Sequence, residues 1–310
     1  MIRFESAHLV GTRAVRVLGA HRSLRGAMCV TAFALASIGC GAAGTPNGST
    51  LPTGGTADAA VRALACGTYT QVDATTVARE GELATVPFLE VVLGDADPCD
   101  SLPLIVVLHG LGGRPVVPRW PYRDLPVAVR IVLPQGPIPW GSGYAWSSVR
   151  TLDHEPAGLE ATIGAQSDRV AAFLDAYLAS MPVRGDVVLV GFSQGAILAL
   201  TMTMQHPAHV GLVLPLAGWV PEALRTDAGE DAPHVRWLHG LDDERIPYSM
   251  ALEAATDLRG RGYDVELIGY PGAHHEMSHA MNERFHSWLS LALENIVAAG
   301  APDEGFVLVP

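Results

Sequence analysis

The segment Gly191-Phe192-Ser193-Gln194-Gly195 constrains this chain more than any other. Four consecutive apolar residues precede it at positions 187–190, and an apolar, helix-forming stretch follows at positions 196–200. This order predicts a strand, a sharp turn and a helix, with Ser193 held at the turn. The two glycines are required because a side chain at either position would collide with the neighbouring strand or helix. Ser193 is therefore a candidate nucleophile.

A glycine-rich turn after a buried strand would explain the same five residues without any chemistry, since the chain has 33 glycines among its 310 residues. A serine hydroxyl is also a poor nucleophile on its own at neutral pH. The chemical interpretation of Ser193 therefore requires a base, an acid and an oxyanion site elsewhere in the chain.

Short apolar runs alternate with helical patterns along the body of the chain. Continuous apolar runs are typical of strands that are covered on both faces, as in a mostly parallel sheet. Residues 159–177 and 277–296 instead place their apolar side chains on one helical face. The alternation predicts an α/β fold of one domain over residues 59–310, with helices on both faces of the sheet and ligands at the carboxyl ends of the strands. The predicted strands are residues 88–93, 104–108, 128–133, 187–190, 210–216, 235–238 and 265–268.

The composition permits a large core, because 49% of the residues are hydrophobic and only 17% are charged. The formal net charge is −12, and the sequence contains no stripe of basic residues. Such a surface does not attract nucleic acid or an anionic membrane by charge. We therefore expect no nucleic-acid partner.

Residues 1–39 resemble an export signal rather than part of the fold. A region with four arginines at positions 13, 16, 22 and 25 precedes an apolar run at positions 27–38, which is too short to span a bilayer. Ser37-Ile38-Gly39-Cys40 resembles a bacterial lipoprotein cleavage box, although Ser37 stands where leucine is usual. This resemblance predicts Cys40 as a lipid anchor and a lipoprotein of the cell envelope. Ordinary cleavage after residues 34–36 is the alternative, which would leave a secreted protein.

Residues 40–58 are rich in Gly, Ser, Thr and Pro, which predicts a flexible tether. If Cys40 carries a lipid, Cys66 and Cys99 remain as an even pair. In an oxidising compartment, such a pair favours a disulfide. Two unrelated buried thiols are the alternative.

A base and an acid for Ser193 follow later in the chain. The predicted strand at 235–238 leads into an acidic loop that contains Asp243, and the strand at 265–268 leads to His275. The order Ser, Asp, His is the order expected of α/β-hydrolases. His275 is the candidate base and Asp243 the candidate acid that orients it. His274 and Asp242 are the alternatives for the same two roles.

The glycine-rich segment 109–113 follows the predicted strand at 104–108. Small residues there allow backbone N–H groups to face the cleft. The N–H groups of Leu111 and of Gln194, the residue after the nucleophile, are the candidate oxyanion donors. A glycine-rich loop without any such role is equally common.

Six motifs in order make the sequence similar to the phospholipase/carboxylesterase family of α/β-hydrolases, which includes acyl-protein thioesterases. The resemblance covers about residues 85–295 and implies a cofactor-free serine hydrolase acting on small-molecule esters or thioesters. It implies Ser193, Asp243 and His275 as the triad, with Leu111 and Gln194 as the oxyanion pair. The motifs are His109-Gly110-Leu111-Gly112-Gly113, Leu133-Pro134-Gln135-Gly136-Pro137, Tyr144-Ala145-Trp146, Gly191-Phe192-Ser193-Gln194-Gly195, His239-Gly240-x-x-Asp243-x-x-Ile246-Pro247 and Tyr270-Pro271-Gly272-x-x-His275-Glu276.

Two departures from the family pattern concern the surroundings of the triad. Leu241 stands two residues before the candidate acid, where the family often has aspartate. Residues 114–121 contain three prolines where a helix would be expected. The wall of the substrate pocket is therefore not predicted by the resemblance.

A competing motif shares the candidate base. His275-Glu276-Met277-Ser278-His279 has the spacing of a zinc-binding helix, in which Glu276 would activate water. Pro271 and Gly272 instead predict that His275 lies at a turn before the helix. We therefore expect no metal.

Three aromatic residues in a Pro/Gly-rich loop, Trp140, Tyr144 and Trp146, are candidates for substrate binding, with packing of the loop on the body as the alternative. The sequence as a whole predicts an exported carboxylesterase. An exported feruloyl-type esterase or polyhydroxyalkanoate depolymerase that stacks its substrate on Trp140 or Trp146 is the main alternative. A non-catalytic surface lipoprotein is a third hypothesis.

Overall fold

The computed structural model describes residues 67–148 and 156–299, all of which belong to one compact unit, Pro52–Pro310. The predicted signal, Cys40, the tether and Cys66 lie outside these residues. The pairing of Cys66 with Cys99 therefore stays a prediction. No helix in the described part of the chain has the length and apolar character needed to cross a membrane.

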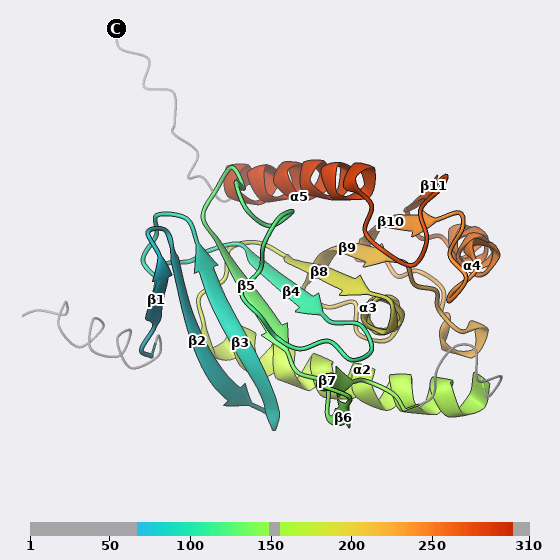
Figure 1. Ribbon diagram of the computed structural model, residues 1–310, viewed down its shortest axis with the longest axis horizontal. Helices are drawn as coiled ribbons and strands as arrows, with labels where there is room; N and C mark the ends of the chain where they lie inside the picture. The colour runs from blue at the N-terminus through green and yellow to red at the C-terminus, as the bar shows by residue number, and fades with distance from the viewer. Residues whose placement is uncertain (1–66, 149–155, 300–310) are drawn as a thin grey trace, which may run out of the picture. The chain divides into compact units, whose positions relative to one another are not determined.

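Nine strands form the central sheet of the described residues, in the order β1-β2-β3-β5-β4-β8-β9-β10-β11 (Figure 1). Neighbouring strands from β5 to β11 run parallel, while β1, β2, β3 and β5 pair antiparallel. The bounds are β1 (Thr70–Asp73), β2 (Thr76–Leu83), β3 (Val86–Leu93), β4 (Leu104–Leu108), β5 (Val129–Pro134), β6 (Ile138–Trp140), β7 (Gly143–Ala145), α2 (Pro156–Ser180), β8 (Val187–Phe192), α3 (Gln194–Gln205), β9 (Val210–Leu216), η2 (Glu222–Leu224), β10 (His234–Gly240), α4 (Tyr248–Gly260), β11 (Val265–Tyr270) and α5 (His279–Ala299).

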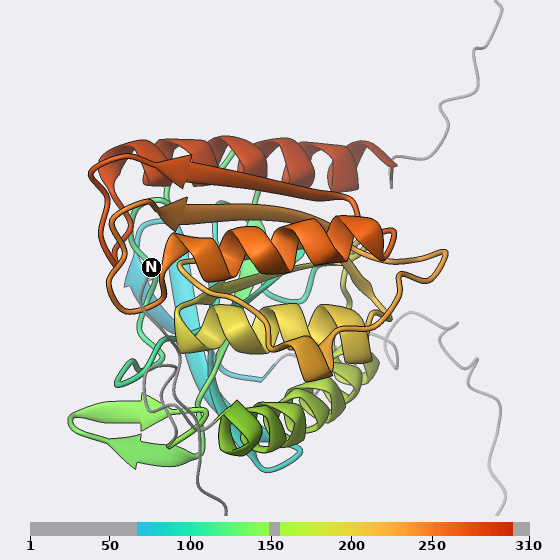
Figure 2. The ribbon, with the colours of Figure 1, turned by 90° about the vertical axis from the view of Figure 1, so that its right-hand side faces the viewer.

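Helices cover both faces of this sheet. Alternate residues of β4 show the two faces, because Leu104 packs in the core formed with α2 and α3, while Ile105 packs in the core formed with α5. In Figure 2, β10 and β11 lie between α5 and α4. Burial on both faces explains why the central strands read as continuous apolar runs.

The predicted α/β-hydrolase architecture is confirmed, as are the seven predicted strands and the three predicted helices, which are α2, α3 and α5. β1, β2, the β6–β7 hairpin and α4 are not among the elements predicted from the sequence. β2 carries charged residues on its partly exposed positions, so that it has no continuous apolar run. The buried face of α4 consists of three alanines and Leu258, which gives a weak hydrophobic period.

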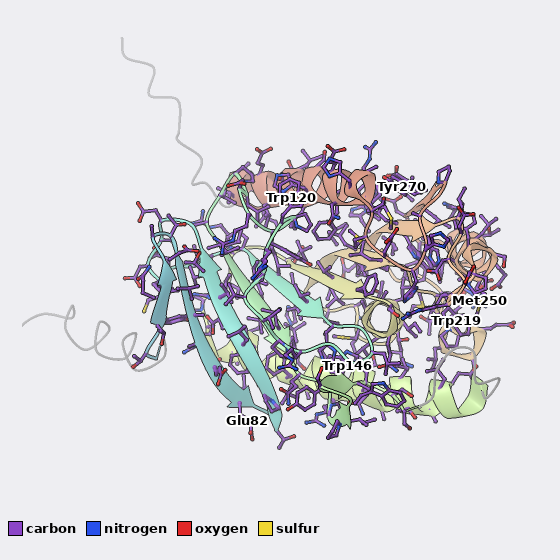
Figure 3. The ribbon with its side chains drawn as sticks, viewed as in Figure 1. Glu82, Trp120, Trp146, Trp219, Met250 and Tyr270 are labelled. Atoms are coloured by element: carbon purple, nitrogen blue, oxygen red, sulfur yellow. The ribbon has the colours of Figure 1, made fainter. Side chains whose placement is uncertain are left out.

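The proline-rich segment that departs from the family pattern is irregular between β4 and β5, with a turn at residues 120–121 and no helix. It packs beside α5, where the Trp120 ring stacks 4.6 Å from His286 and Tyr122 meets Phe285 edge-on at 5.3 Å. Figure 3 shows Trp120 alongside α5. This segment and α5 therefore cover the same face of the sheet.

Candidate active site

Ser193 lies in a strained turn between β8 and α3. Its backbone angles are φ 54° and ψ −118°, a combination that residues other than glycine rarely adopt. This sharp turn brings the backbone at positions 191 and 195 very close to neighbouring backbone atoms. A Cβ built on Gly191 would lie 2.2 Å from the Gly195 carbonyl oxygen, and one on Gly195 would lie 2.1 Å from the Leu108 carbonyl oxygen. Both flanking glycines are thus required by space, as the sequence predicted.

Replacing Gly195 with alanine is expected to lower the free energy of unfolding by about 3 kcal/mol, because backbone atoms cannot move away from the new methyl group. Thermal or denaturant unfolding of the purified protein measures this loss. Gly164→Ala in α2 is the matched control, since the nearest atom to its new Cβ would be 3.9 Å away. That change is expected to leave stability unchanged or raise it by up to about 1 kcal/mol. Equal stability of the two variants would contradict the steric argument.

His275 and Asp243 complete a chain of hydrogen bonds that begins at Ser193. The Ser193 Oγ lies 2.8 Å from His275 Nε2, and His275 Nδ1 lies 2.7 Å from Asp243 Oδ2. Asp243 follows β10 and His275 follows β11, so the carboxyl ends of neighbouring parallel strands bring them together. The structure therefore places the three predicted side chains within hydrogen-bonding reach of one another.

The Asp243 carboxylate is buried and its second oxygen is also bonded. Asp243 Oδ1 accepts hydrogen bonds from the backbone N–H groups of Arg245 and Ile246, both at 2.9 Å. Its side chain has no exposed surface. These bonds aim Oδ2 at the imidazole and keep the carboxylate from rotating.

The alternative base and acid point elsewhere. His274 is exposed, and its Nδ1 lies 3.0 Å from the Asp242 carbonyl oxygen. The Asp242 carboxylate accepts a hydrogen bond of 2.8 Å from the backbone N–H of Gly272. Both residues fix the turn that carries His275 and do not contact Ser193 in the described hydrogen bonds.

The zinc hypothesis needs His275 and His279 on one helix, and the structure does not have this geometry. α5 begins at His279, while His275 lies in a bend before it. Both ring nitrogens of His275 face Ser193 and Asp243. The His279 side chain is 84% exposed and pairs with Glu283 at 3.3 Å. These positions do not form a shared metal site.

The loop after β4 lies against the nucleophile turn. A Cβ on Gly110 would be 3.4 Å from the Ser193 Cβ. The amide of Gly112 donates to the Tyr144 carbonyl oxygen at 2.8 Å and that of Gly113 to the Gly110 carbonyl oxygen at 2.9 Å, which fixes the loop after Leu111. Gln194 is the first residue of α3, so its N–H has no partner within the helix. Both candidate oxyanion donors therefore lie on segments next to Ser193.

His109 holds this loop to its neighbours as a neutral imidazole. Its Nδ1–H donates to the Gly110 carbonyl oxygen at 2.8 Å, and its Nε2 accepts from the Gly136 N–H at 3.0 Å. Burial keeps the pKa of His109 below its usual range. In the sequence, this histidine stands out only as the first residue of the motif at 109–113.

The prediction that Trp146 binds substrate is wrong. Its side chain has no exposed surface, its ring stacks on His109 at 5.0 Å, and its Nε1–H donates to the His109 carbonyl oxygen at 2.8 Å. The buried Gln194 side chain holds the same segment, because its Oε1 accepts from the Trp146 N–H and its Nε2 donates to the Ser147 carbonyl oxygen, both at 2.8 Å. Trp146, labelled near β7 in Figure 3, supports the loop instead.

Trp140 and Tyr144 lie on the β6–β7 hairpin, which contacts the candidate oxyanion loop. The Trp140 ring would lie 3.6 Å from a Cβ on Gly112, and the residue is 36% exposed. Tyr144 lines a pocket of about 330 Å³ that also contains Arg114 and Gln135. Trp140 is thus an exposed aromatic surface beside the candidate oxyanion loop.

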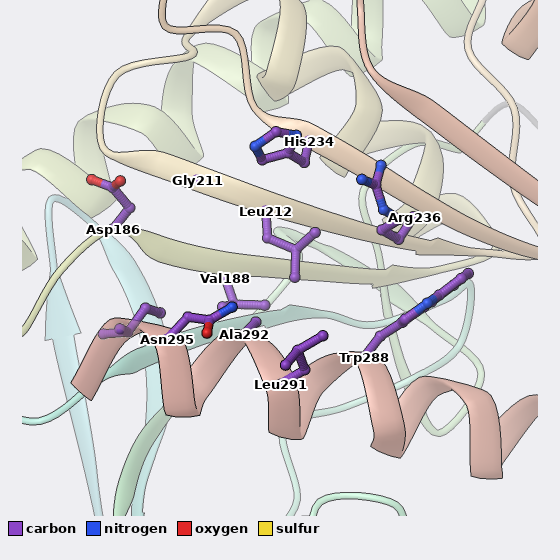
Figure 4. Close-up of a pocket in the computed structure, with 11 residues that line it drawn as sticks. Asp186, Val188, Gly211, Leu212, His234, Arg236, Trp288, Leu291, Ala292 and Asn295 are labelled. Carbon is purple, nitrogen blue, oxygen red and sulfur yellow. The ribbon is translucent and has the colours of Figure 1, made fainter. Parts of the chain in front are cut away.

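A second pocket of about 300 Å³ lies at the amino ends of β8, β9 and β10, away from the carboxyl ends that carry the triad. It is formed between the first residues of these strands and α5 (Figure 4). Val188, Leu212 and Trp288 contribute apolar surface to its lining, which also includes Arg236. It contains none of the triad residues.

The sheet, the strained serine turn and the aligned Ser, His and Asp side chains define an α/β-hydrolase. The family model for phospholipase/carboxylesterase matches residues 97–293. Because this match covers more than half of the chain, the protein belongs to the phospholipase/carboxylesterase family and is a hydrolase of the carboxylesterase type.

The relatives agree with this assignment. The SOBER1-like probable carboxylesterase of Arabidopsis thaliana is 28% identical over 130 residues, 41% of this chain, and the match spans only half (50%) of that relative. Carboxylesterase SOBER1 of the same plant is 26% identical over 206 residues, which cover 61% of this chain and 90% of the relative. The solved structure of esterase PE8 shares the fold, with a TM-score of 0.51 and 23% identity over 61% of this chain and 92% of that one.

Proposed function

We propose that this protein hydrolyses carboxylic esters through an acyl-enzyme on Ser193, with His275 as base and Asp243 as the acid that orients it. The unbroken path from Ser193 Oγ to His275 at 2.8 Å and from His275 to Asp243 at 2.7 Å carries this proposal. It supplies the activation that an isolated serine hydroxyl lacks.

His275 Nε2 takes the hydroxyl proton as Ser193 Oγ attacks the ester carbonyl carbon. The resulting imidazolium gives this proton to the departing alkoxide, which leaves as the alcohol. Water, deprotonated by the same imidazole, then attacks the carbonyl carbon of the acyl-enzyme. As the bond from this carbon to Ser193 Oγ breaks, the imidazolium returns the proton to Oγ, which releases the carboxylic acid and restores the free serine. Asp243 keeps the proton of the neutral imidazole on Nδ1 and offsets the positive charge during both steps.

The N–H groups of Leu111 and Gln194 stabilise the oxyanion in both tetrahedral intermediates. Amide donors held in place before the reaction need no reorganisation as charge develops on the carbonyl oxygen. The bonds made by His109 and by the Gln194 side chain support this arrangement, because they fix the segments on which the donors lie. No step requires a cofactor.

A panel of substrates tests the proposal. A chromogenic short-chain acetate ester is expected to be hydrolysed by the purified full chain without added metal. Hydrolysis of the corresponding thioester would indicate thioesterase activity, and hydrolysis of a feruloyl ester would indicate the feruloyl-type alternative. Absence of turnover on all three would favour the non-catalytic surface lipoprotein.

Replacing Trp140 with alanine is expected to raise the KM for an aromatic acyl ester about tenfold, with kcat changed less than threefold. The exposed ring beside Gly112 can stack on an aromatic acid, and a loss of about 1.4 kcal/mol of stacking corresponds to this change. Steady-state kinetics with feruloyl and acetate esters measure it.

Trp120→Ala is the control for Trp140→Ala, because that ring is also exposed but stacks on His286 beside α5. If the Trp140 variant has an unchanged KM for every ester, Trp140 does not bind the substrate. The feruloyl-type alternative therefore depends on Trp140, since Trp146 is buried.

We also propose that the protein is exported and held at the cell envelope through a lipid on Cys40, with a disulfide between Cys66 and Cys99. The signal-like composition of residues 1–39 and the even number of later cysteines support this location. Contact with a membrane would then occur only through the lipid. Fractionation of cells that produce the native chain or Cys40→Ser tests the anchor.

A further inference from the structure

His239 is a buried polar residue to which the proposed mechanism assigns no task. It is the next-to-last residue of β10, and its side chain has no exposed surface. Its Nε2 lies 2.8 Å from the Ile246 carbonyl oxygen and 3.4 Å from Asp243 Oδ2. Its Nδ1 is buried without a hydrogen-bond partner among the described residues. Burial of an imidazole in this way is costly, which calls for a compensating role.

The contacts of His239 determine its protonation. Because two oxygen acceptors face Nε2, the proton is on Nε2 and the unpaired Nδ1 is bare. Burial holds the pKa of His239 below its usual range. Tyr248 faces the ring from α4 at 6.0 Å, and His275 lies beyond Asp243. His239 is therefore a neutral donor that leaves the charge of Asp243 available to His275.

Ile246 connects His239 to the loop that carries Asp243. Its backbone N–H donates to Asp243 Oδ1 at 2.9 Å, while its carbonyl oxygen accepts from His239 Nε2 at 2.8 Å. The Asp243 carboxylate is otherwise bonded to its own turn through the Arg245 amide and to His275. The His239 side chain thus joins this turn to the rigid end of β10.

We propose that His239 is a positioning residue of the triad, whose Nε2–H holds the Ile246 carbonyl oxygen and the Asp243 carboxylate so that Oδ2 stays aimed at His275 Nδ1. This inference rests on the proposed function. It assigns a role in catalysis to a side chain that does not touch the substrate.

Two substitutions separate the effect of the His239 Nε2–H donor from the effect of the volume that the His239 side chain fills. His239→Met fills a similar volume without an N–H group, and His239→Gln keeps an N–H at about the reach of Nε2 with no charge at any pH. We expect the Met variant to lose roughly 10–30-fold in kcat with KM within about twofold, which corresponds to losing one interaction made in the transition state. The Gln variant is expected to recover kcat to within about threefold of the wild type.

The measurement uses the full chain and counts active sites by titration with a fluorophosphonate. A variant that only folds less well would show fewer titrated sites but an unchanged kcat per site. A second readout is the downfield proton resonance of His275 Nδ1–H, which should broaden or disappear in the Met variant and persist in the Gln variant. His234→Met is the matched control, because His234 begins the same strand at its opposite, exposed end.

A wild-type kcat per site in the Met variant, or equal losses in the Met and Gln variants, would overturn the positioning role. If the wild-type chain hydrolyses no ester and takes no label, the proposed function fails instead. The His275 resonance still decides the role of His239 in that case, since it reports the His275–Asp243 bond without turnover.

Discussion

Replacing Ser193 with alanine is expected to lower kcat/KM for ester hydrolysis by roughly 10⁴–10⁶-fold, because the acyl-enzyme can no longer form. The fold should persist, since the change removes only the Oγ atom that lies 2.8 Å from His275. Steady-state kinetics with a chromogenic acetate ester measure the loss, and thermal unfolding verifies the fold.

Ser180→Ala is the control for the serine substitution. Ser180 closes α2 with a bond from its hydroxyl to the Tyr177 carbonyl oxygen, and it lies outside the triad. Its loss should leave kcat/KM within twofold. Activity that survives Ser193→Ala and disappears with a chelator would contradict the serine mechanism and favour the zinc hypothesis.

Replacing Asp243 with asparagine is expected to lower kcat by roughly 10⁴-fold with little change in KM, because the imidazole takes the wrong tautomer. The backbone amides of Arg245 and Ile246 would hold the asparagine carbonyl oxygen where Oδ1 now lies. The amide NH₂ group would then face His275 Nδ1 and require a bare nitrogen there. The proton would move to Nε2 and point at Ser193 Oγ, which leaves the imidazole unable to accept the hydroxyl proton.

Asp242→Asn is the matched control for this change. Asp242 is adjacent and exposed, and its carboxylate accepts a hydrogen bond from the Gly272 N–H. Its substitution should change kcat less than threefold. A larger effect at Asp242 than at Asp243 would show that the acid has been assigned to the wrong residue.

The positions of the three triad residues could be predicted from sequence because each follows a predicted strand: an unbroken apolar run precedes Ser193, and largely apolar runs interrupted by Arg236 and Glu266 precede Asp243 and His275. An unbroken apolar run marks a strand buried on both faces, as in β8, and the carboxyl ends of parallel strands meet at one edge of a sheet. Ser193, Asp243 and His275 thus needed only the order of strands and turns. The distances between the three side chains could be obtained only from the structure, because the sequence of one strand does not show its register with the neighbouring strands.

The supporting residues could not be predicted in the same way. Trp146 stands in a Pro/Gly-rich loop, and composition alone does not show that Gln194 and His109 hold this loop against the body. The role of His239 depends on the Ile246 carbonyl oxygen, a backbone atom with no signature in sequence. Residues that act through backbone contacts between distant segments become visible only in three dimensions.

Fluorophosphonate labelling of the full chain, with the modified peptide mapped by mass, tests the central claim most directly. We expect one label per molecule, located on Ser193, and its absence in Ser193→Ala. Labelling on another residue, or ester hydrolysis by a chain that takes no label at Ser193, would contradict the proposed mechanism.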